Sequence, residues 1–390
     1  MNIFDKFQQL AEAREAMEEN CGDFFNIVME DIISGTEAVV NGRTVLLAGS
    51  NNYLGMTFNA ECIRTACQAV QREGTGTTGS RMANGTFSGH VALEQELSDF
   101  FNRLNTIVFS TGYIANLAML STVVGSGEVI LLDADCHASI YDGCRLGGAE
   151  VIRFRHNDAN DLEKRLRRLT KRNTNVLIVV EGLYSMLGDR APLADIATLK
   201  NKYGAYLLID EAHSLGVLGP NGRGLAEETG VENSVDFVVG TFSKSLGAVG
   251  GFCASNHPEL NLVRYASRSY VFTASSSPSI IASTRTALRI MRSQPELRHR
   301  LWDNANLLYQ RLKDFDFCVG PEASPIIAIR YKNAEEAFAV WNGLMERGVY
   351  VNMVLPPATP DGGALLRCSL SAAHTREQVD KIGDAFAALR

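Results

Sequence analysis

The chain carries seven short, almost continuous apolar segments that alternate with helical patterns, and this alternation constrains its fold more than any other feature. The segment at 176–181, for example, reads VLIVVE and is followed by a helical stretch over 192–203. Continuous apolar strands separated by helices are typical of a parallel or largely parallel sheet with both faces covered. We therefore expect a large α/β domain with a mostly parallel seven-stranded sheet. The predicted strands are 107–110, 128–133, 151–154, 176–181, 205–210, 236–242 and 250–255.

The beginning of the chain has a different pattern. Phe4 to Glu19 indicates an amphipathic helix, and Glu37 to Leu47 indicates a hairpin that turns at Asn41-Gly42, a strong short-range hairpin signal. These elements predict an N-terminal arm or lid over residues 1–50.

The end of the chain predicts a second, smaller domain. After Pro278 a long helical stretch runs to about Phe315, and shorter strands and helices follow it. Two or three strands with two covering helices make a small α+β domain. We therefore place the large domain at 51–278 and the small domain at 279–390. The predicted small-domain elements are strands at 325–331, 349–354 and 364–370, a helix over 334–347 and a helix from Thr375.

Charge and hydropathy restrict the partners and the location. Among 390 residues, 37 Lys and Arg stand against 44 Asp and Glu, a net charge of −7 that does not favour nucleic acid. The charged opening does not match a secretory signal, so we expect a cytoplasmic protein. The uncharged run from Thr106 to Gly127 contains polar residues and glycines, and we interpret it as strand, turn and helix rather than a membrane span. The N-terminal helix allows at most a peripheral membrane contact.

Eight cysteines are scattered through the chain without a CxxC pair or a Cys/His spacing suited to zinc. We expect reduced cysteines and no metal site.

Chemistry-bearing residues follow four of the predicted strands, where an α/β sheet binds its ligands. Gly112 and Tyr113 lie at a turn into a helix, whose free N–H groups can bind an anion, although such turns are also ordinary connections. His137 follows the second strand and is open to interpretation as a hydrogen-bonded loop residue. Asp210 ends another strand, where it could simply cap the next helix. Lys244 lies among hydroxyls, glycines and apolar residues, which predicts a desolvated amine with a lowered pKa.

Together these side chains match the needs of pyridoxal 5′-phosphate (PLP). This cofactor requires a lysine for an imine, an acid for its ring nitrogen, an aromatic face for its ring and donors for its phosphate. Lys244, Asp210, His137 and the Gly112-Tyr113 turn with Thr241 supply one of each.

Five motifs in this order resemble the α-oxoamine synthases, PLP enzymes of fold type I that condense an amino acid with an acyl thioester and release carbon dioxide. The resemblance extends from about Phe24 to the end of the chain. The motifs are TGY at 111–113, DADCHASI at 133–140, EGLYSMLGD at 181–189, DEAHSLGVLGPNGRG at 210–224 and GTFSKSLGAVGG at 240–251.

The resemblance implies a role for each matching cofactor-site residue. Lys244 forms the imine and, once displaced, acts as the base; Asp210 holds the ring nitrogen. His137 stacks on the ring, while His213 and Ser185 lie near the phenolic oxygen. The implied phosphate contacts are Gly112, Tyr113, Thr241, Ser243 and, across a homodimer with shared active sites, Thr273.

The resemblance also implies how the substrate carboxylate is held. Arg367 ends a strand-like segment and matches the residue that binds this group in the family, assisted by Asn52. A guanidinium suits the role because it can make two parallel hydrogen bonds to a carboxylate. The alternative for Arg367 is a structural salt bridge.

Three further stretches are most similar to the bacterial branch that joins L-serine to palmitoyl-CoA, giving 3-ketosphinganine in the first step of sphingolipid synthesis. They lie at 24–58, 74–87 and 349–375. Other branches use glycine, alanine or cysteate with other acyl groups, and these alternatives stay open, as do the acyl carrier and chain length. A catalytically inactive regulatory subunit is a further alternative, against which the presence of Lys244, Asp210, His137 and His213 argues.

Overall fold

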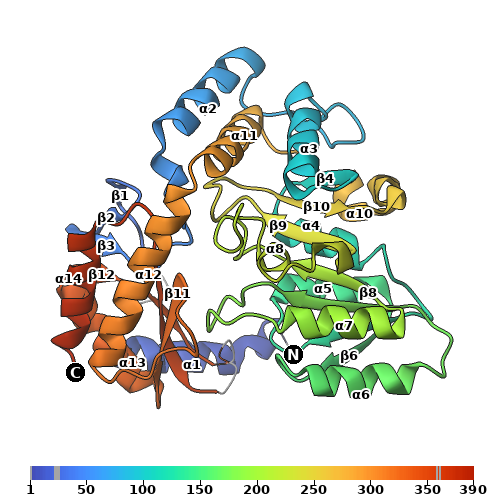
Figure 1. The fold of residues 1–390 in the computed structure, drawn as a ribbon. Coiled ribbons are helices and arrows are strands. Elements are labelled where there is room, and N and C mark those ends of the chain that lie inside the picture. Colours follow the sequence, from blue (N-terminus) through green and yellow to red (C-terminus); the bar gives the residue numbers. More distant parts are fainter. Residues whose placement is uncertain (1, 22–26, 357–358, 360–361) are drawn as a thin grey trace.

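The seven apolar segments form one sheet in the computed structural model of the chain (Figure 1). Its order is β4-β10-β9-β8-β7-β5-β6, and β10 is antiparallel to both neighbours while β5 to β9 run parallel. All residues of β5 and β9 are buried, which explains their continuous apolar sequences. The predicted mostly parallel sheet is confirmed. The strands are β4 (Asn105–Phe109), β5 (Val129–Asp133), β6 (Glu150–Phe154), β7 (Val176–Glu181), β8 (Tyr206–Asp210), β9 (Phe237–Thr241) and β10 (Gly251–Ser255).

Helices cover both faces of this sheet. α4 (Gly112–Leu120) packs on α5 (Ala138–Gly147), and α6 (Ala159–Leu169) packs on α7 (Leu193–Tyr203). The connections through α4 and α5 lead along the sheet toward β6, whereas those through α6 and α7 lead back toward β8. Because crossovers between parallel strands are right-handed, the two pairs of helices lie on opposite faces of the sheet. The remaining helices and 3-10 turns of this region are η2 (Met56–Phe58), α2 (Ala60–Glu73), α3 (Ser88–Phe101), α8 (Leu225–Glu228), η3 (Glu232–Ser234), η4 (Pro258–Leu262), α9 (Val263–Ala266) and α10 (Arg268–Val271).

The predicted long helix after Pro278 consists of two helices, α11 (Pro278–Ser293) and α12 (Glu296–Asp314). They are separated at Gln294 and Pro295 because proline has no N–H to continue the helical ladder. A three-stranded antiparallel sheet with the order β11-β14-β13 follows. Its elements and helices are β11 (Ile326–Tyr331), α13 (Ala334–Glu346), β13 (Asn352–Val354), β14 (Ala364–Ser369) and α14 (Arg376–Ala387).

The predicted N-terminal hairpin is present as β2 (Glu37–Val40) and β3 (Arg43–Leu47). Asn41 and Gly42 both have positive φ, 50° and 68°, as a tight two-residue hairpin turn requires. The strand predicted at 349–354 divides in two, since β12 (Val349–Tyr350) leaves β13 and pairs in parallel with β3. With β1 (Asp31–Ile32) these strands form a four-stranded sheet of order β1-β2-β3-β12, so the hairpin is joined to a C-terminal strand. The domain boundaries at 50 and 278 stay predictions.

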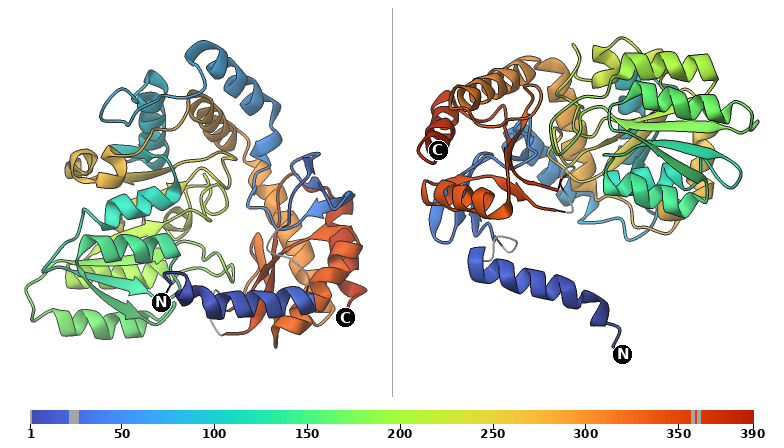
Figure 2. Two further views of the ribbon diagram at one scale, coloured as in Figure 1. Left: turned by 180° about the vertical axis from the view of Figure 1, so that it is seen from behind. Right: turned by 90° about the horizontal axis from the view of Figure 1, so that it is seen from below.

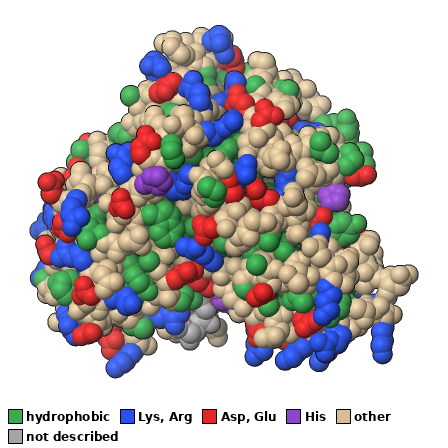
Figure 3. All heavy atoms as spheres, in the orientation of Figure 1, with side chains coloured by type: hydrophobic (Ala, Val, Ile, Leu, Met, Phe, Trp, Pro, Cys, Tyr) green, Lys and Arg blue, Asp and Glu red, His purple; other side chains and the backbone are tan. Residues whose placement is uncertain are grey.

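The predicted N-terminal helix is η1 (Asp5–Phe7) followed by α1 (Gln8–Cys21), which extends away from the other elements in the right-hand view of Figure 2. Figure 3 shows acidic and basic side chains interspersed over one face of the molecule. No helix in the described part of the chain is long and apolar enough to span a membrane. The structure describes residues 2–21, 27–356, 359 and 362–390, so the stretches quoted at 24–58 and 349–375 lie partly outside it.

Candidate active site

A pocket of about 280 Å³ opens at the carboxyl ends of the parallel strands. Eight of the predicted site residues line it, and they come from segments that follow β4, β5, β8 and β9. Ser185, Thr273, Asn52 and Arg367 are not among its lining residues. The predicted residues in the pocket are Gly112, Tyr113, His137, Asp210, His213, Thr241, Ser243 and Lys244.

Lys244 lies in the turn between β9 and β10. Its neighbours Phe242 and Leu246 are buried and anchor the turn. Burial lowers the pKa of Lys244 to about 8, although the nearby carboxylates of Asp210 and Glu181 oppose the shift. An appreciable fraction of this amine is therefore uncharged near neutral pH, as a nucleophile requires.

Asp210 is held by two hydrogen bonds at the end of β8. Its Oδ2 accepts from Nδ2 of Asn116 at 2.7 Å, and its Oδ1 accepts from the N–H of Ala212 at 2.9 Å. Asn116 also donates to Oγ of Ser139 at 3.0 Å. The carboxylate is thus fixed in direction while it lines the pocket.

Glu181 is a second carboxyl group in the pocket, at the end of β7 and in register with Asp210 on β8. Burial, together with the charge of Asp210, raises the pKa of Glu181 well above its usual value. Burial therefore favours the neutral form of the Glu181 carboxyl group.

His137 begins α5 and has a fixed orientation. Its backbone N–H donates to Oε1 of Glu181 at 2.5 Å, and its Nδ1 accepts from the N–H of Ser139 at 3.2 Å. Burial lowers the pKa of His137, so the ring is neutral. The Tyr113 ring lies edge-on to it, with 6.4 Å between centroids.

His213 is connected to Arg367 through Tyr53. The Tyr53 hydroxyl lies 2.8 Å from Nδ1 of His213 and 3.5 Å from Nη2 of Arg367. Burial lowers the pKa of His213 well below its ordinary value and raises the pKa of Tyr53 to about 12. The Tyr53 hydroxyl also donates to Oδ1 of Asn51 at 3.3 Å, so it joins His213, Arg367 and Asn51 in one network.

Arg367 is buried and makes two further contacts. Its Nε donates to the carbonyl of Ser185 at 2.6 Å, and its Nη2 donates to Oδ1 of Asn51 at 2.9 Å. The predicted helper, Asn52, instead donates to Oγ1 of Thr57 at 2.8 Å. The structure therefore brings Asn51 rather than Asn52 to the guanidinium.

Gly112 and Thr241 form a cradle for an anion at the start of α4. A Cβ on Gly112 would lie 2.8 Å from Cβ of Thr241, so the two segments meet only because residue 112 is glycine. Oγ1 of Thr241 lies 2.9 Å from Oγ of Ser243. Two hydroxyls beside the free N–H groups of a nine-residue helix match the donors that a phosphate requires, and with Lys244 and Asp210 the pocket fits PLP.

The Gly112→Ala variant is expected to lose PLP affinity by about tenfold or more, equivalent to ~1.4 kcal/mol, because the new methyl group displaces Thr241. Titration of the apoprotein with PLP, followed by absorbance, measures the change. Gly76→Ala is the matched control, since a Cβ there meets nothing within 4 Å. Equal affinities of the two variants would contradict the position of the phosphate.

Thr273 lies outside the pocket. It lines a separate small cavity with Arg81, His90 and Tyr270. The next residue toward the N-terminus, Phe272, is 79% exposed. Thr273 itself is half-buried.

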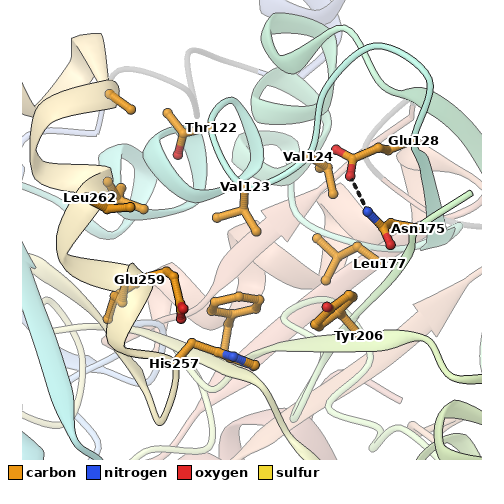
Figure 4. Close-up of a pocket in the computed structure, with 14 residues that line it drawn as sticks. Thr122, Val123, Val124, Glu128, Asn175, Leu177, Tyr206, His257, Glu259 and Leu262 are labelled. Atoms are coloured by element: carbon orange, nitrogen blue, oxygen red, sulfur yellow. Dashed lines mark hydrogen bonds between the residues drawn. The ribbon is translucent and has the colours of Figure 1, made fainter.

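A larger cavity, about 430 Å³, lies at the opposite, amino-terminal edge of the parallel strands (Figure 4). Glu128 and Asn175 hydrogen-bond each other across its rim at 2.8 Å, near Tyr206 and His257. None of the predicted site residues lines it. Among the described residues, no group of three or more His, Cys, Asp or Glu side chains is arranged to hold a metal ion.

Sequence reasoning missed four residues of the site: Asn51, Tyr53, Asn116 and Glu181. Glu181 ends the segment VLIVVE just as Asp210 ends AYLLID. Since an α/β sheet binds its ligands at the carboxyl ends of its strands, this position could have identified Glu181. Asn116 lies one helical turn after Gly112, which places it near the same end of α4.

The chain was compared with known protein families, sequences and structures. Residues 43–386 match the family model Aminotransferase class I and II. The chain is 57% identical over 382 residues to a serine palmitoyltransferase of Caulobacter vibrioides, covering 98% of this chain and 95% of that protein. The structure of Sphingomonas wittichii serine palmitoyltransferase superposes with a TM-score of 0.97 at 50% identity, covering 100% of this chain and 98% of the other. A high-resolution structure of SPT with PLP internal aldimine gives the same TM-score at 49% identity and the same coverage.

Proposed function

Because this chain belongs to the aminotransferase class I and II family, we propose that it is a PLP-dependent acyltransferase that condenses L-serine with palmitoyl-CoA and releases carbon dioxide, giving 3-ketosphinganine. The relatives most similar in sequence and structure carry the name serine palmitoyltransferase, and PLP is bound in a structural relative. The single observation that carries the proposal is the convergence of Lys244, Asp210, His137 and His213 on one pocket.

In this proposal each pocket residue holds one part of PLP. Lys244 binds it covalently, Asp210 faces its ring nitrogen and the neutral ring of His137 stacks on it. His213 donates a hydrogen bond from Nε2 to the phenolic oxygen of PLP, and Ser185 lies near the same edge of the ring. The phosphate is held by the N–H groups of Gly112 and Tyr113, by Thr241 and Ser243, and by the partner subunit's Thr273. When bound, PLP supplies an electron sink for a carbanion at the substrate α-carbon.

The protein groups then position the substrate and move its proton. Arg367, oriented by the Ser185 carbonyl and Asn51, binds the serine carboxylate with two parallel hydrogen bonds. Once the substrate amine has displaced it, Nζ of Lys244 would accept the α-proton, which the lowered pKa of the free amine favours. Assistance of the carboxylate by Asn52 stays a prediction.

We also propose a cytoplasmic homodimer with shared active sites. The exposed position of Phe272 next to Thr273 supports this assembly, because Thr273 lies outside the pocket of its own subunit. The homodimer, the cytoplasmic location and the role of Thr273 are predictions.

Mass spectrometry of the products formed from the holoenzyme, L-serine and palmitoyl-CoA tests the function. We expect 3-ketosphinganine and carbon dioxide, and a larger response of the cofactor absorbance to serine than to glycine, alanine or cysteate. A preference for another amino acid would indicate another branch of the family. Absence of any condensation product with intact PLP binding would favour the regulatory-subunit alternative.

A further inference from the structure

His156 lies between two aspartates at the carboxyl edge of the large sheet, outside the residues assigned above. Its Nδ1 is 2.8 Å from Oδ1 of Asp133, and its Nε2 is 2.7 Å from Oδ2 of Asp189. Asp133 is the last residue of β5 and is completely buried, while Asp189 lies in the loop after β7. A histidine that donates from both ring nitrogens is protonated and positively charged.

Asn157, like His156, forms hydrogen bonds to both Asp133 and Asp189. Its N–H donates to Oδ2 of Asp133 at 2.9 Å, and its Nδ2 donates to Oδ2 of Asp189 at 2.8 Å. Four hydrogen bonds from His156 and Asn157 therefore join the end of β5 to the loop over residues 182–190. We call Asp133, His156, Asn157 and Asp189 the His156 clamp.

The 182–190 loop is a closed turn wedged against the small domain. The N–H of Tyr184 donates to the carbonyl of Asp189 at 2.9 Å, and the N–H of Gly188 donates to the carbonyl of Tyr184 at 3.0 Å. A Cβ on Gly188 would lie 2.2 Å from the carbonyl oxygen of Ile326 on β11, so the backbones of the two domains are in direct contact here. A shift of Asp189 therefore moves the whole turn.

Ser185, at the tip of this turn, presents its carbonyl to Nε of Arg367 at 2.6 Å. Arg367 lies on β14 of the small domain, whereas the clamp is anchored on the large domain. The clamp is thus connected, through one loop, to the guanidinium of Arg367.

We propose that His156 is a positioning residue that, held between Asp133 and Asp189, orients Arg367 for the carboxylate of the amino-acid substrate. The inference rests on the proposed function and adds a residue that does not touch the substrate.

The environment of His156 keeps it charged. Burial alone would lower the pKa of His156, but the hydrogen bonds and charges of Asp133 and Asp189 outweigh burial and raise the pKa to about 10. The other titratable groups that face it are Asp135, whose Oδ2 is 3.9 Å from Nδ1, and Tyr184, whose ring lies edge-on at 4.5 Å. Since the folded pKa is raised, the stabilisation by the clamp is complete below the unfolded value of about 6.5 and is lost as the pH rises through the folded value.

The test compares two ligands of the PLP-loaded enzyme, L-serine and ethanolamine, which lacks only the carboxylate. The His156→Asn variant is expected to weaken serine binding about 10- to 100-fold, measured by the change in cofactor absorbance, and to leave ethanolamine binding unchanged. In an Arg367→Lys background the same substitution should add little, because both changes act on one contact. An equal loss for both ligands, or full additivity with Arg367→Lys, would overturn the inference.

A second variant and a control complete the design. Asp189→Asn preserves side-chain volume, removes one carboxylate and should reproduce the selective loss if His156→Asn does not fold. His299→Asn, on an exposed histidine, should match the unsubstituted enzyme with both ligands. If the cofactor absorbance of the unsubstituted enzyme responds to none of serine, glycine, alanine and cysteate, both the proposed function and this inference are wrong. A normal response that neither clamp variant changes overturns this inference alone.

Discussion

The Lys244→Ala variant is expected to fold, to lack the visible absorbance band of lysine-linked PLP and to lose about 10⁴-fold or more in turnover. The substitution removes the amine that both binds the cofactor and accepts the α-proton. Among the residues that the structure describes, no other lysine lines the pocket, so none of them can replace this amine.

Absorbance spectra of the purified protein with added PLP, and mass spectrometry after borohydride reduction, measure the covalent linkage. Lys171→Ala, on an exposed residue, is the control and should retain both the band and the cofactor mass. An unchanged spectrum in Lys244→Ala would contradict the assignment of Lys244 as the residue that binds PLP covalently.

The Asp210→Asn variant should retain PLP but turn over several orders of magnitude more slowly, since a neutral amide cannot stabilise a proton on the ring nitrogen. PLP binding persists because Lys244 and the phosphate cradle are unchanged. The side chain keeps its shape and Oδ1 can still accept from Ala212, while an NH2 group replaces the Oδ2 that accepts from Asn116.

Steady-state rates together with the cofactor content measure this effect. Asp195→Asn, an exposed position on α7, controls for the loss of one surface carboxylate. Turnover near that of the unsubstituted protein would show that Asp210 does not support the ring nitrogen.

The large sheet could be predicted because strands such as β5 and β9 are buried along their whole length, so that their segments are almost continuously apolar. The residues that follow those strands, such as His137 and Asp210, could be predicted for the same reason, since parallel strands bring their carboxyl ends to one edge. The division of 349–354 could not, because β12 and β13 join different sheets and nothing local in the sequence marks the change of partner.

The support for Arg367 and His213 depends on contacts that the linear sequence does not contain. Tyr53 meets His213 across 160 positions, and Asn51 meets Arg367 across 316. Asn51 and Asn52 are chemically identical and adjacent, and only the backbone direction decides which amide faces the guanidinium. The family resemblance assigns Asn52 to the substrate carboxylate, and that role stays a prediction.

The pairing of β3 with β12 has a consequence for synthesis of the protein. Residues 46 and 47 pair with 349 and 350, so β3 cannot acquire this neighbour until β12 has also been translated. Non-local pairs of this kind form late, because the entropy of closing a long loop must be overcome first. During elongation the edge of β3 is therefore unprotected, and the nascent chain depends on the completed C-terminal segment, or on a chaperone, to cover it.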